Sequence, residues 1–254
     1  MAQPRPMLRT RKLVRDFRGF RAVNEVNLEV AAGSVHALVG PNGAGKTTLF
    51  NLLTGFLAPT SGRVELDGHN VTGLPPERIT RLGVARSFQI TSLFPQLTAR
   101  DHVELALMSS SGLGHKFWRS AKLVHRFADR AMAILDEVNL AELALSTADS
   151  LPYGRKRALE LAIAVALHPR LLLLDEPTAG MGLEDVDRTV ELIAKVRAGR
   201  TVVMVEHNMS VVGRLADRVT VLQAGRVLVE GSYDEVRNDD RVITAYLGGA
   251  DAAH

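Results

Sequence analysis

The sequence predicts an α/β fold with a mostly parallel core sheet, an N-terminal antiparallel β subdomain and an inserted α-helical subdomain. Apolar runs at residues 35–39, 171–174 and 201–205 each suit one strand that is buried on both faces, as in parallel sheets. Residues 26–30 alternate apolar and polar side chains, which favours a half-buried antiparallel strand. From about 90 to 168 the apolar spacing becomes helical, so we expect this block to be inserted into the core.

A glycine-rich stretch directly follows the first buried run. Residues 40–48 fit the G-x-x-x-x-G-K-[ST] pattern of a phosphate-binding loop. Glycines let backbone N–H groups approach phosphate oxygens, and the helix N-terminus that follows adds the positive end of its dipole. We therefore expect phosphate binding by Gly40, Pro41, Asn42, Gly43, Ala44, Gly45, Lys46, Thr47 and Thr48.

Side chains of this loop and of the second buried run supply the remaining nucleotide contacts. Lys46 offers a point charge to the β- and γ-phosphates, and Thr47 offers a hydroxyl to Mg²⁺. Asp175, the first polar residue after the run at 171–174, fits the carboxylate that helps hold Mg²⁺ in such enzymes. The core is therefore predicted to be that of a phosphate-loop NTPase.

Two more polar residues are expected at the same edge of the sheet, because open α/β sheets place their sites at the carboxyl ends of the strands. Glu176 follows Asp175 and is placed to accept a proton from the attacking water. His207 stands just beyond the run at 201–205. A lone histidine there is more often structural, but beside the site it could sense the γ-phosphate.

The composition excludes several other classes of chemistry. The 254 residues include no cysteine, so disulfides, thiolate catalysis and cysteine–zinc sites are excluded. The apolar runs are too short to span a bilayer and the polar N-terminus has no signal-peptide core, so we expect a cytosolic chain. The net charge is +3, with arginines concentrated near the start. We favour a solvated, arginine-rich edge over a surface for nucleic acid or lipid.

The order of the motifs closely resembles an ATP-binding cassette (ABC) ATPase, over nearly the whole chain from residue 17 to 247. The resemblance implies one nucleotide-binding domain at 1–254, with a catalytic core lobe at about 1–89 and 169–254 and a helical lobe at about 90–168. It implies ATP and Mg²⁺ as cofactors. It also implies a head-to-tail dimer, two transmembrane permease subunits, an indirect link to an extracytoplasmic solute-binding protein, and a location on the cytoplasmic face of the inner membrane.

The resemblance assigns roles to individual residues. Gln89 corresponds to the glutamine that links the nucleotide and its Mg²⁺ to the transmembrane partner. Glu176 corresponds to the catalytic base and His207 to the switch histidine. Phe17 falls at the family's adenine-stacking aromatic, although the sequence alone favours a core role for it and makes Phe20 an equal candidate.

The signature stretch at 151–155 departs from the family pattern. The usual Leu-Ser-Gly-Gly-Gln is replaced by Leu-Pro-Tyr-Gly-Arg, in which Pro152 removes a hydroxyl and a backbone donor. Gly154 still permits close backbone approach to a phosphate, so we expect it to contact the ATP that the partner subunit's loop holds. Gly182 stands where the family commonly has Asp, so communication between the two sites is expected to differ.

The finer resemblance is to the ATPases of branched-chain and hydrophobic amino acid importers. Urea and short-chain amide importers have similar ATPases, as does lipopolysaccharide export, and these remain alternatives. A soluble, nucleic-acid-linked ABC ATPase is an alternative of another class, but one phosphate loop and the absence of cysteine argue against it. Whether the dimer is formed with an identical or a related chain is left open. The stretches that carry the finer resemblance are 83–89, 153–157, 179–181, 205–209 and 241–248.

Overall fold

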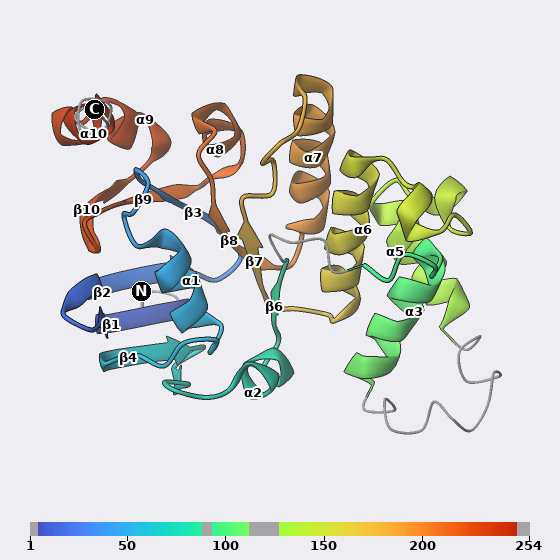
Figure 1. The fold of residues 1–254 in the computed structure, drawn as a ribbon, viewed down its shortest axis with the longest axis horizontal. Coiled ribbons are helices and arrows are strands. Elements are labelled where there is room, and N and C mark those ends of the chain that lie inside the picture. Colours follow the sequence, from blue (N-terminus) through green and yellow to red (C-terminus); the bar gives the residue numbers. More distant parts are fainter. Residues whose placement is uncertain (1–4, 88–92, 112–126, 248–254) are drawn as a thin grey trace.

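A computed structural model describes residues 5–87, 93–111 and 127–247 (Figure 1). These residues form a four-stranded antiparallel sheet in the order β2-β1-β4-β5 and a six-stranded sheet in the order β10-β9-β3-β8-β7-β6. The strands of the smaller sheet are β1 (Pro6–Phe17), β2 (Phe20–Ala31), β4 (Ser61–Leu66) and β5 (His69–Asn70). Those of the larger sheet are β3 (Val35–Val39), β6 (Val84–Arg86), β7 (Leu171–Asp175), β8 (Thr201–Val205), β9 (Arg218–Gln223) and β10 (Arg226–Gly231).

The larger sheet is parallel except at one edge. Strand β3 pairs in parallel with β8 and β9, and β7 pairs in parallel with β8 and β6, whereas β9 and β10 form an antiparallel hairpin. The carboxyl ends of β3, β7 and β8 therefore lie side by side. This arrangement confirms the predicted fold class and brings the three strand ends to one edge of the sheet.

Both faces of the larger sheet are covered, which explains the uninterrupted apolar runs. In β8, Val202 and Met204 pack into one core cluster, while Val203 and Val205 pack into another on the opposite face. Helix α1 (Lys46–Leu53) and the antiparallel sheet cover the second face. The first face is covered by α6 (Tyr153–Ala166), α7 (Leu183–Val196) and α8 (Met209–Leu215), while α3 (Ala99–Ser110) and α5 (Ala128–Glu137) pack against α6 in the same core cluster.

The helical block lies at the end of the molecule away from the antiparallel sheet, where α3, α5 and α6 pack together (Figure 1). Two short 3₁₀ helices, Ala141–Leu143 and Ala148–Ser150, precede α6. The remaining helices are α2 (Pro76–Arg81), α9 (Tyr233–Arg237) and α10 (Asp240–Leu247). The described part of the chain contains no helix long and apolar enough to cross a bilayer.

Candidate functional site

The loop between β3 and α1 lines a cavity of about 270 Å³ at the carboxyl edge of the larger sheet. Most of the residues that the sequence predicts for nucleotide binding meet there, although β7 and β8 lie far from the loop in sequence. The residues that line the cavity are Phe20, Ala22, Asn42, Gly43, Ala44, Gly45, Lys46, Thr47, Thr48, Glu176 and His207.

Neighbouring backbone explains why two loop positions must be glycine. Gly40 has φ +148°, and a Cβ on it would lie 2.2 Å from the carbonyl oxygen of Leu222 in β9. Gly45 has φ +98°, and a Cβ there would lie 2.3 Å from the carbonyl oxygen of Ala22 in β2. Strands of both sheets therefore lie against the loop, and a side chain on Gly40 or Gly45 would displace the backbone of the loop. The fold thus shapes the cradle of N–H groups as much as the loop sequence does.

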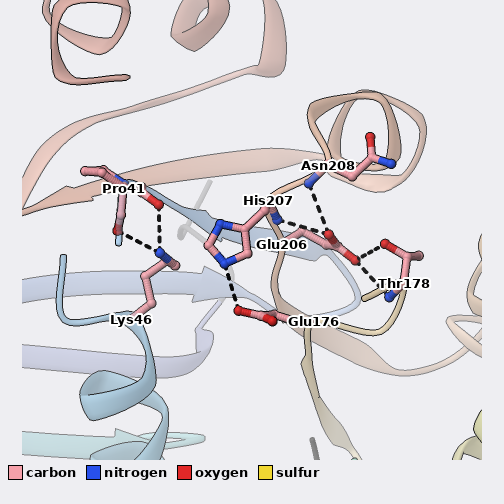
Figure 2. A network of polar contacts seen from close by, with 8 residues as sticks. Pro41, Lys46, Glu176, Thr178, Glu206, His207 and Asn208 are labelled. Atoms are coloured by element: carbon pink, nitrogen blue, oxygen red, sulfur yellow. Dashed lines mark hydrogen bonds and ion pairs between the residues drawn. The ribbon is translucent and has the colours of Figure 1, made fainter. Parts of the chain in front are cut away.

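Lys46 turns back over the loop that precedes it. Its Nζ donates hydrogen bonds to the carbonyl oxygens of Gly40, at 2.7 Å, and Pro41, at 2.9 Å (Figure 2). Burial lowers the pKa of Lys46, while the nearby charge of Glu176 acts to raise it. The ammonium group is thereby held against the phosphate loop and near the charge of Glu176, the residue that follows β7.

The two polar residues predicted for catalysis touch each other. His207 Nε2 lies 2.7 Å from Glu176 Oε1, although the residues come from the ends of different strands (Figure 2). Glu176 has φ +48°, a left-handed conformation that is uncommon for residues with a side chain. Its N–H donates to the carbonyl oxygen of Val205 at 2.9 Å, which ties the turn to β8. Backbone strain of this kind is found where the surroundings over-determine a functional side chain.

A buried carboxylate that the sequence analysis did not single out organises this pair. Glu206 Oε1 accepts hydrogen bonds from the N–H of Thr178, at 3.1 Å, and from its hydroxyl, at 2.6 Å. Glu206 Oε2 accepts from the N–H groups of His207, at 3.0 Å, and Asn208, at 3.2 Å (Figure 2). The carboxylate therefore joins the segment after β7 to the segment after β8. Its sequence signal is its place as the first polar residue after a buried run.

Asp175, predicted to help hold Mg²⁺, is buried at the end of β7 and forms an ion pair with a second residue that the sequence analysis gave no role. Arg86 Nη2 lies 2.6 Å from Asp175 Oδ2. Arg86 is the last residue of the short strand β6, which pairs with β7. The sequence signal for Arg86 was that a charged residue ends a short apolar strand.

The predicted adenine-stacking ring, Phe17, does not line the cavity. Phe17 ends β1 opposite Phe20, and the guanidinium of Arg15 lies 4.6 Å from the centre of its ring. Phe20, rather than Phe17, is among the residues that line the cavity. Gln89 lies outside the described residues, so its predicted role stays a prediction.

Gly154 lies in the first turn of α6, away from the loop of its own chain. A Cβ on Gly154 would come within 2.8 Å of the carboxylate of Asp185 in α7, so a larger residue here would have to push that side chain aside. The hydroxyl of Tyr153 donates to the carbonyl oxygen of Ala179 at 3.1 Å. The signature stretch is thus attached to the segment that follows Glu176, and its predicted contact with a second subunit's nucleotide stays a prediction.

Comparison with known proteins identifies the family to which this site belongs. Residues 23–179, more than half of the chain, match the family described as ABC transporter. The chain belongs to this family. As an ABC cassette it binds and hydrolyses ATP, which agrees with the phosphate loop, Glu176 and His207 meeting at one cavity. Residues 226–252 also match a family described as branched-chain amino acid ATP-binding cassette transporter.

Individual relatives are similar to this chain over most of its length. The high-affinity branched-chain amino acid transport ATP-binding protein BraF of Pseudomonas aeruginosa is 41% identical, across 97% of this chain and 99% of its own. The ADP conformation of MJ1267, an ATP-binding cassette of an ABC transporter, superposes with a TM-score of 0.84 at 28% identity, covering 96% of this chain and 99% of that one. The dimeric post-hydrolysis state of the cassette MJ0796, bound to ADP and Pi, has a TM-score of 0.75 at 26% identity, covering 89% and 99%.

Proposed function

We propose that this ABC ATPase powers the uptake of branched-chain or other hydrophobic amino acids. The observation that carries the proposal is its likeness to BraF over nearly the full length of both chains. The match of residues 226–252 to a family of branched-chain amino acid cassettes supports the same assignment from an independent part of the chain.

The residues at the cavity fit a nucleoside triphosphate. The loop from Gly40 to Gly45 is a backbone cradle held against β9 and β2, where a side chain on Gly40 or Gly45 would clash, and Lys46 adds a cation. These groups bind and orient the β- and γ-phosphates. An aromatic ring from the turn between β1 and β2 stacks on the adenine. Phe17 is the candidate by resemblance, and Phe20 is the one that lines the cavity.

The donor set also suits Mg²⁺, a cation that prefers oxygen ligands. The Thr47 hydroxyl and the Asp175 carboxylate would hold the ion, together with Gln89, which lies outside the described residues. When bound, Mg²⁺ neutralises charge on the phosphate oxygens. The described residues do not by themselves enclose a metal, because they hold no cluster of three or more acidic or histidine ligands. The phosphates would therefore supply the remaining ligands.

Glu176 acts as the general base of hydrolysis. Its carboxylate accepts a proton from the water that attacks the γ-phosphate, and the ring of His207, 2.7 Å away, orients it. Glu206 fixes the backbone of residues 207 and 208, and so places the ring. A few tenths of an ångström matter here, because a base works only within hydrogen-bond reach of the proton it takes.

The working unit is a head-to-tail dimer with an identical or a related chain, in which Gly154 of one subunit faces the ATP held by the other. The dimeric MJ0796 cassette supports this assembly. ATP binding closes the dimer and hydrolysis reopens it, so that γ-phosphate contacts bias a two-state equilibrium. We take about 1–89 and 169–254 as the core lobe and about 90–168 as the helical lobe of each subunit.

Two permease subunits receive this motion, and an extracytoplasmic solute-binding protein delivers the amino acid to them. A groove of about 780 Å³ lies between α2 and the end of α3, and the ring of Phe56 in it is 52% exposed. The groove is continuous with β6, three residues before Gln89, which makes it the best candidate surface for a permease segment. The ATPase would accordingly sit on the cytoplasmic face of the inner membrane.

A pull-down tests the proposal. Tagged Glu176→Gln protein, loaded with Mg-ATP, is used to capture partners from native membranes. We expect two polytopic permeases whose companion binding protein takes leucine, isoleucine or valine. A companion that binds urea or amides, or permeases of lipopolysaccharide export, would overturn the amino acid assignment. Nucleic acid or soluble partners alone would overturn the transport assignment. Lys46→Ala serves as the control, because it should lose ATP affinity and with it any nucleotide-dependent capture.

A further inference from the structure

Arg86 links the end of β7 to helix α1 through polar contacts, in addition to the apolar core that the two elements share. Its side chain is 12% exposed, and its Nη2 donates to the Oδ2 of Asp175, whose side chain is 2% exposed. Its Nη1 donates to Asn51 Oδ1 at 2.7 Å and to Thr54 Oγ1 at 3.4 Å. Asn51 lies in α1, the helix that begins at Lys46. One guanidinium therefore ties the end of β7 to the helix that carries the phosphate-loop lysine.

The same side chain lines the groove between α2 and α3. Arg86, Thr54 and Phe56 are all among the residues that form the groove. The guanidinium carbon of Arg86 lies 5.8 Å from the centre of the Phe56 ring, within cation–π range, and 5.7 Å from that of Phe50. A movement of the exposed Phe56 ring thus reaches Asp175 through a single intervening residue.

We propose that Arg86 is a positioning residue that fixes the Asp175 carboxylate for the Mg²⁺-nucleotide and couples it to the Phe56 ring in the groove. The planar fork of arginine suits this task, because it can hold Asp175 with one nitrogen and Asn51 with the other. A lysine has the same charge but presents it as a point, so it cannot reproduce both contacts at fixed angles. The inference rests on the proposed nucleotide site and deepens it.

The test measures nucleotide affinity of the full chain with and without Mg²⁺, using ADP as the probe. Partners that hold a ligating carboxylate typically change metal affinity about 10–100-fold when removed, so Arg86→Gln should weaken the apparent affinity for Mg²⁺ by that range. Affinity for ADP in excess EDTA should stay within about twofold, because the loop and Lys46 are untouched. Arg86→Lys should fall between the wild type and Arg86→Gln, and it also serves if the glutamine variant folds poorly.

Arg200→Gln is the matched control for losing a buried arginine. Arg200 is 17% exposed and pairs with Glu137 at 3.4 Å, remote from the cavity. We expect it to lower the unfolding midpoint and leave the Mg²⁺ dependence of ADP binding unchanged. The proposal is overturned if Arg86→Gln weakens ADP equally with and without Mg²⁺, if it leaves Mg²⁺ affinity unchanged, or if it raises that affinity. A wild-type chain that binds no ADP would instead refute the proposed nucleotide site.

Phe56→Ala tests the connection to the groove. Removing one exposed cation–π contact should weaken Mg²⁺ affinity by about two- to fivefold, although Phe56 lies outside the nucleotide cavity. Because the effect is expected to pass through Arg86, Phe56→Ala should cause no further loss when added to Arg86→Gln. An effect of equal size in both backgrounds, or none in the wild-type background, would overturn the coupling.

Discussion

Strands β7 and β8 end in similar pairs of ionisable residues, but the buried carboxylates of the two pairs are held in different ways. Each strand leads into two ionisable residues in succession: Asp175, the last residue of β7, with Glu176 after it, and Glu206 with His207 directly after β8. In both pairs the first side chain is buried and the second reaches the cavity. Because the strands are parallel neighbours, the two second residues meet at 2.7 Å.

The two buried carboxylates are stabilised in different ways. Asp175 is balanced by a cation, Arg86, which enters from the neighbouring strand β6. Glu206 accepts hydrogen bonds from three backbone N–H groups and one hydroxyl. A carboxylate held by a side chain can respond to that side chain, whereas one held by backbone is as rigid as the turns around it. The end of β7 is therefore the responsive side of the site and the end of β8 the fixed side.

The largest expected effect is on turnover and comes from Glu176, the cavity-lining residue that directly follows β7. Glu176→Gln keeps the size of the side chain but removes the base, so ATP hydrolysis should fall by about 10²–10⁴-fold. Binding of Mg-ATP should persist, because the loop and Asp175 are unchanged. Single-turnover hydrolysis and equilibrium ATP binding measured on the same preparation check this. Turnover within tenfold of wild type would contradict the assignment of Glu176 as base, and the ends of β7 and β8 would then no longer differ in function.

The next effect is on stability and comes from the buried residue of β8. In Glu206→Gln the amide nitrogen must face N–H donors on one side, which leaves buried donors unpaired and should cost about 2–3 kcal/mol of unfolding free energy. Urea denaturation measures this, with the exposed Glu191→Gln in α7 as control, expected within about 0.5 kcal/mol of wild type. A loss in Glu206→Gln as small as that of the control would mean that backbone donors do not hold the end of β8.

Features that leave a pattern in the sequence were predicted, whereas contacts that depend on tertiary packing were not. The runs that became β3, β7 and β8 were recognisable because strands buried on both faces are apolar throughout. The phosphate loop was recognisable because its backbone conformation and close neighbours require glycine at fixed positions. Arg86 and Glu206 received no role, because a partner 89 residues away, or a contact with a neighbouring turn, leaves no periodic trace.

Short helices were missed for a related reason. Helices α8 and α9 are too short to show an apolar period, although both carry capping signals. Asn208 accepts from the N–H of Ser210, and Ser232 forms a capping box with Glu235. Which aromatic ring lines the cavity also could not be decided from sequence, because Phe17 and Phe20 flank one turn and only the fold shows that Phe20 lines it.

A third strand, β3, extends the comparison to acid stability. Burial lowers the pKa of His36 to about 4, with the charge of Glu230 opposing the shift. The pKa of His36 in the folded chain lies below the unfolded value near 6.5. The stability that neutral His36 contributes is therefore fully present above pH 6.5 and is lost as the pH falls through 4. Between pH 7.5 and 5 the wild type should lose about 2 kcal/mol more than His36→Gln. Denaturant titrations at both pH values test this, and parallel losses in the two proteins would contradict it.

The smallest expected effect isolates one bond of the support behind His207. Thr178→Val removes the hydroxyl that lies 2.6 Å from Glu206 but keeps the backbone N–H at 3.1 Å, so it should cost about 1 kcal/mol. For a chain of this size that corresponds to a drop of about 2–4 °C in Tm. The matched control is Thr189→Val, whose hydroxyl donates to the sulfur of Met181, a weak acceptor, at 3.3 Å and which should change Tm by less. If Thr178→Val cost as much as Glu206→Gln, the hydroxyl rather than the backbone would hold the carboxylate, and the end of β8 would be as responsive to side-chain change as the end of β7.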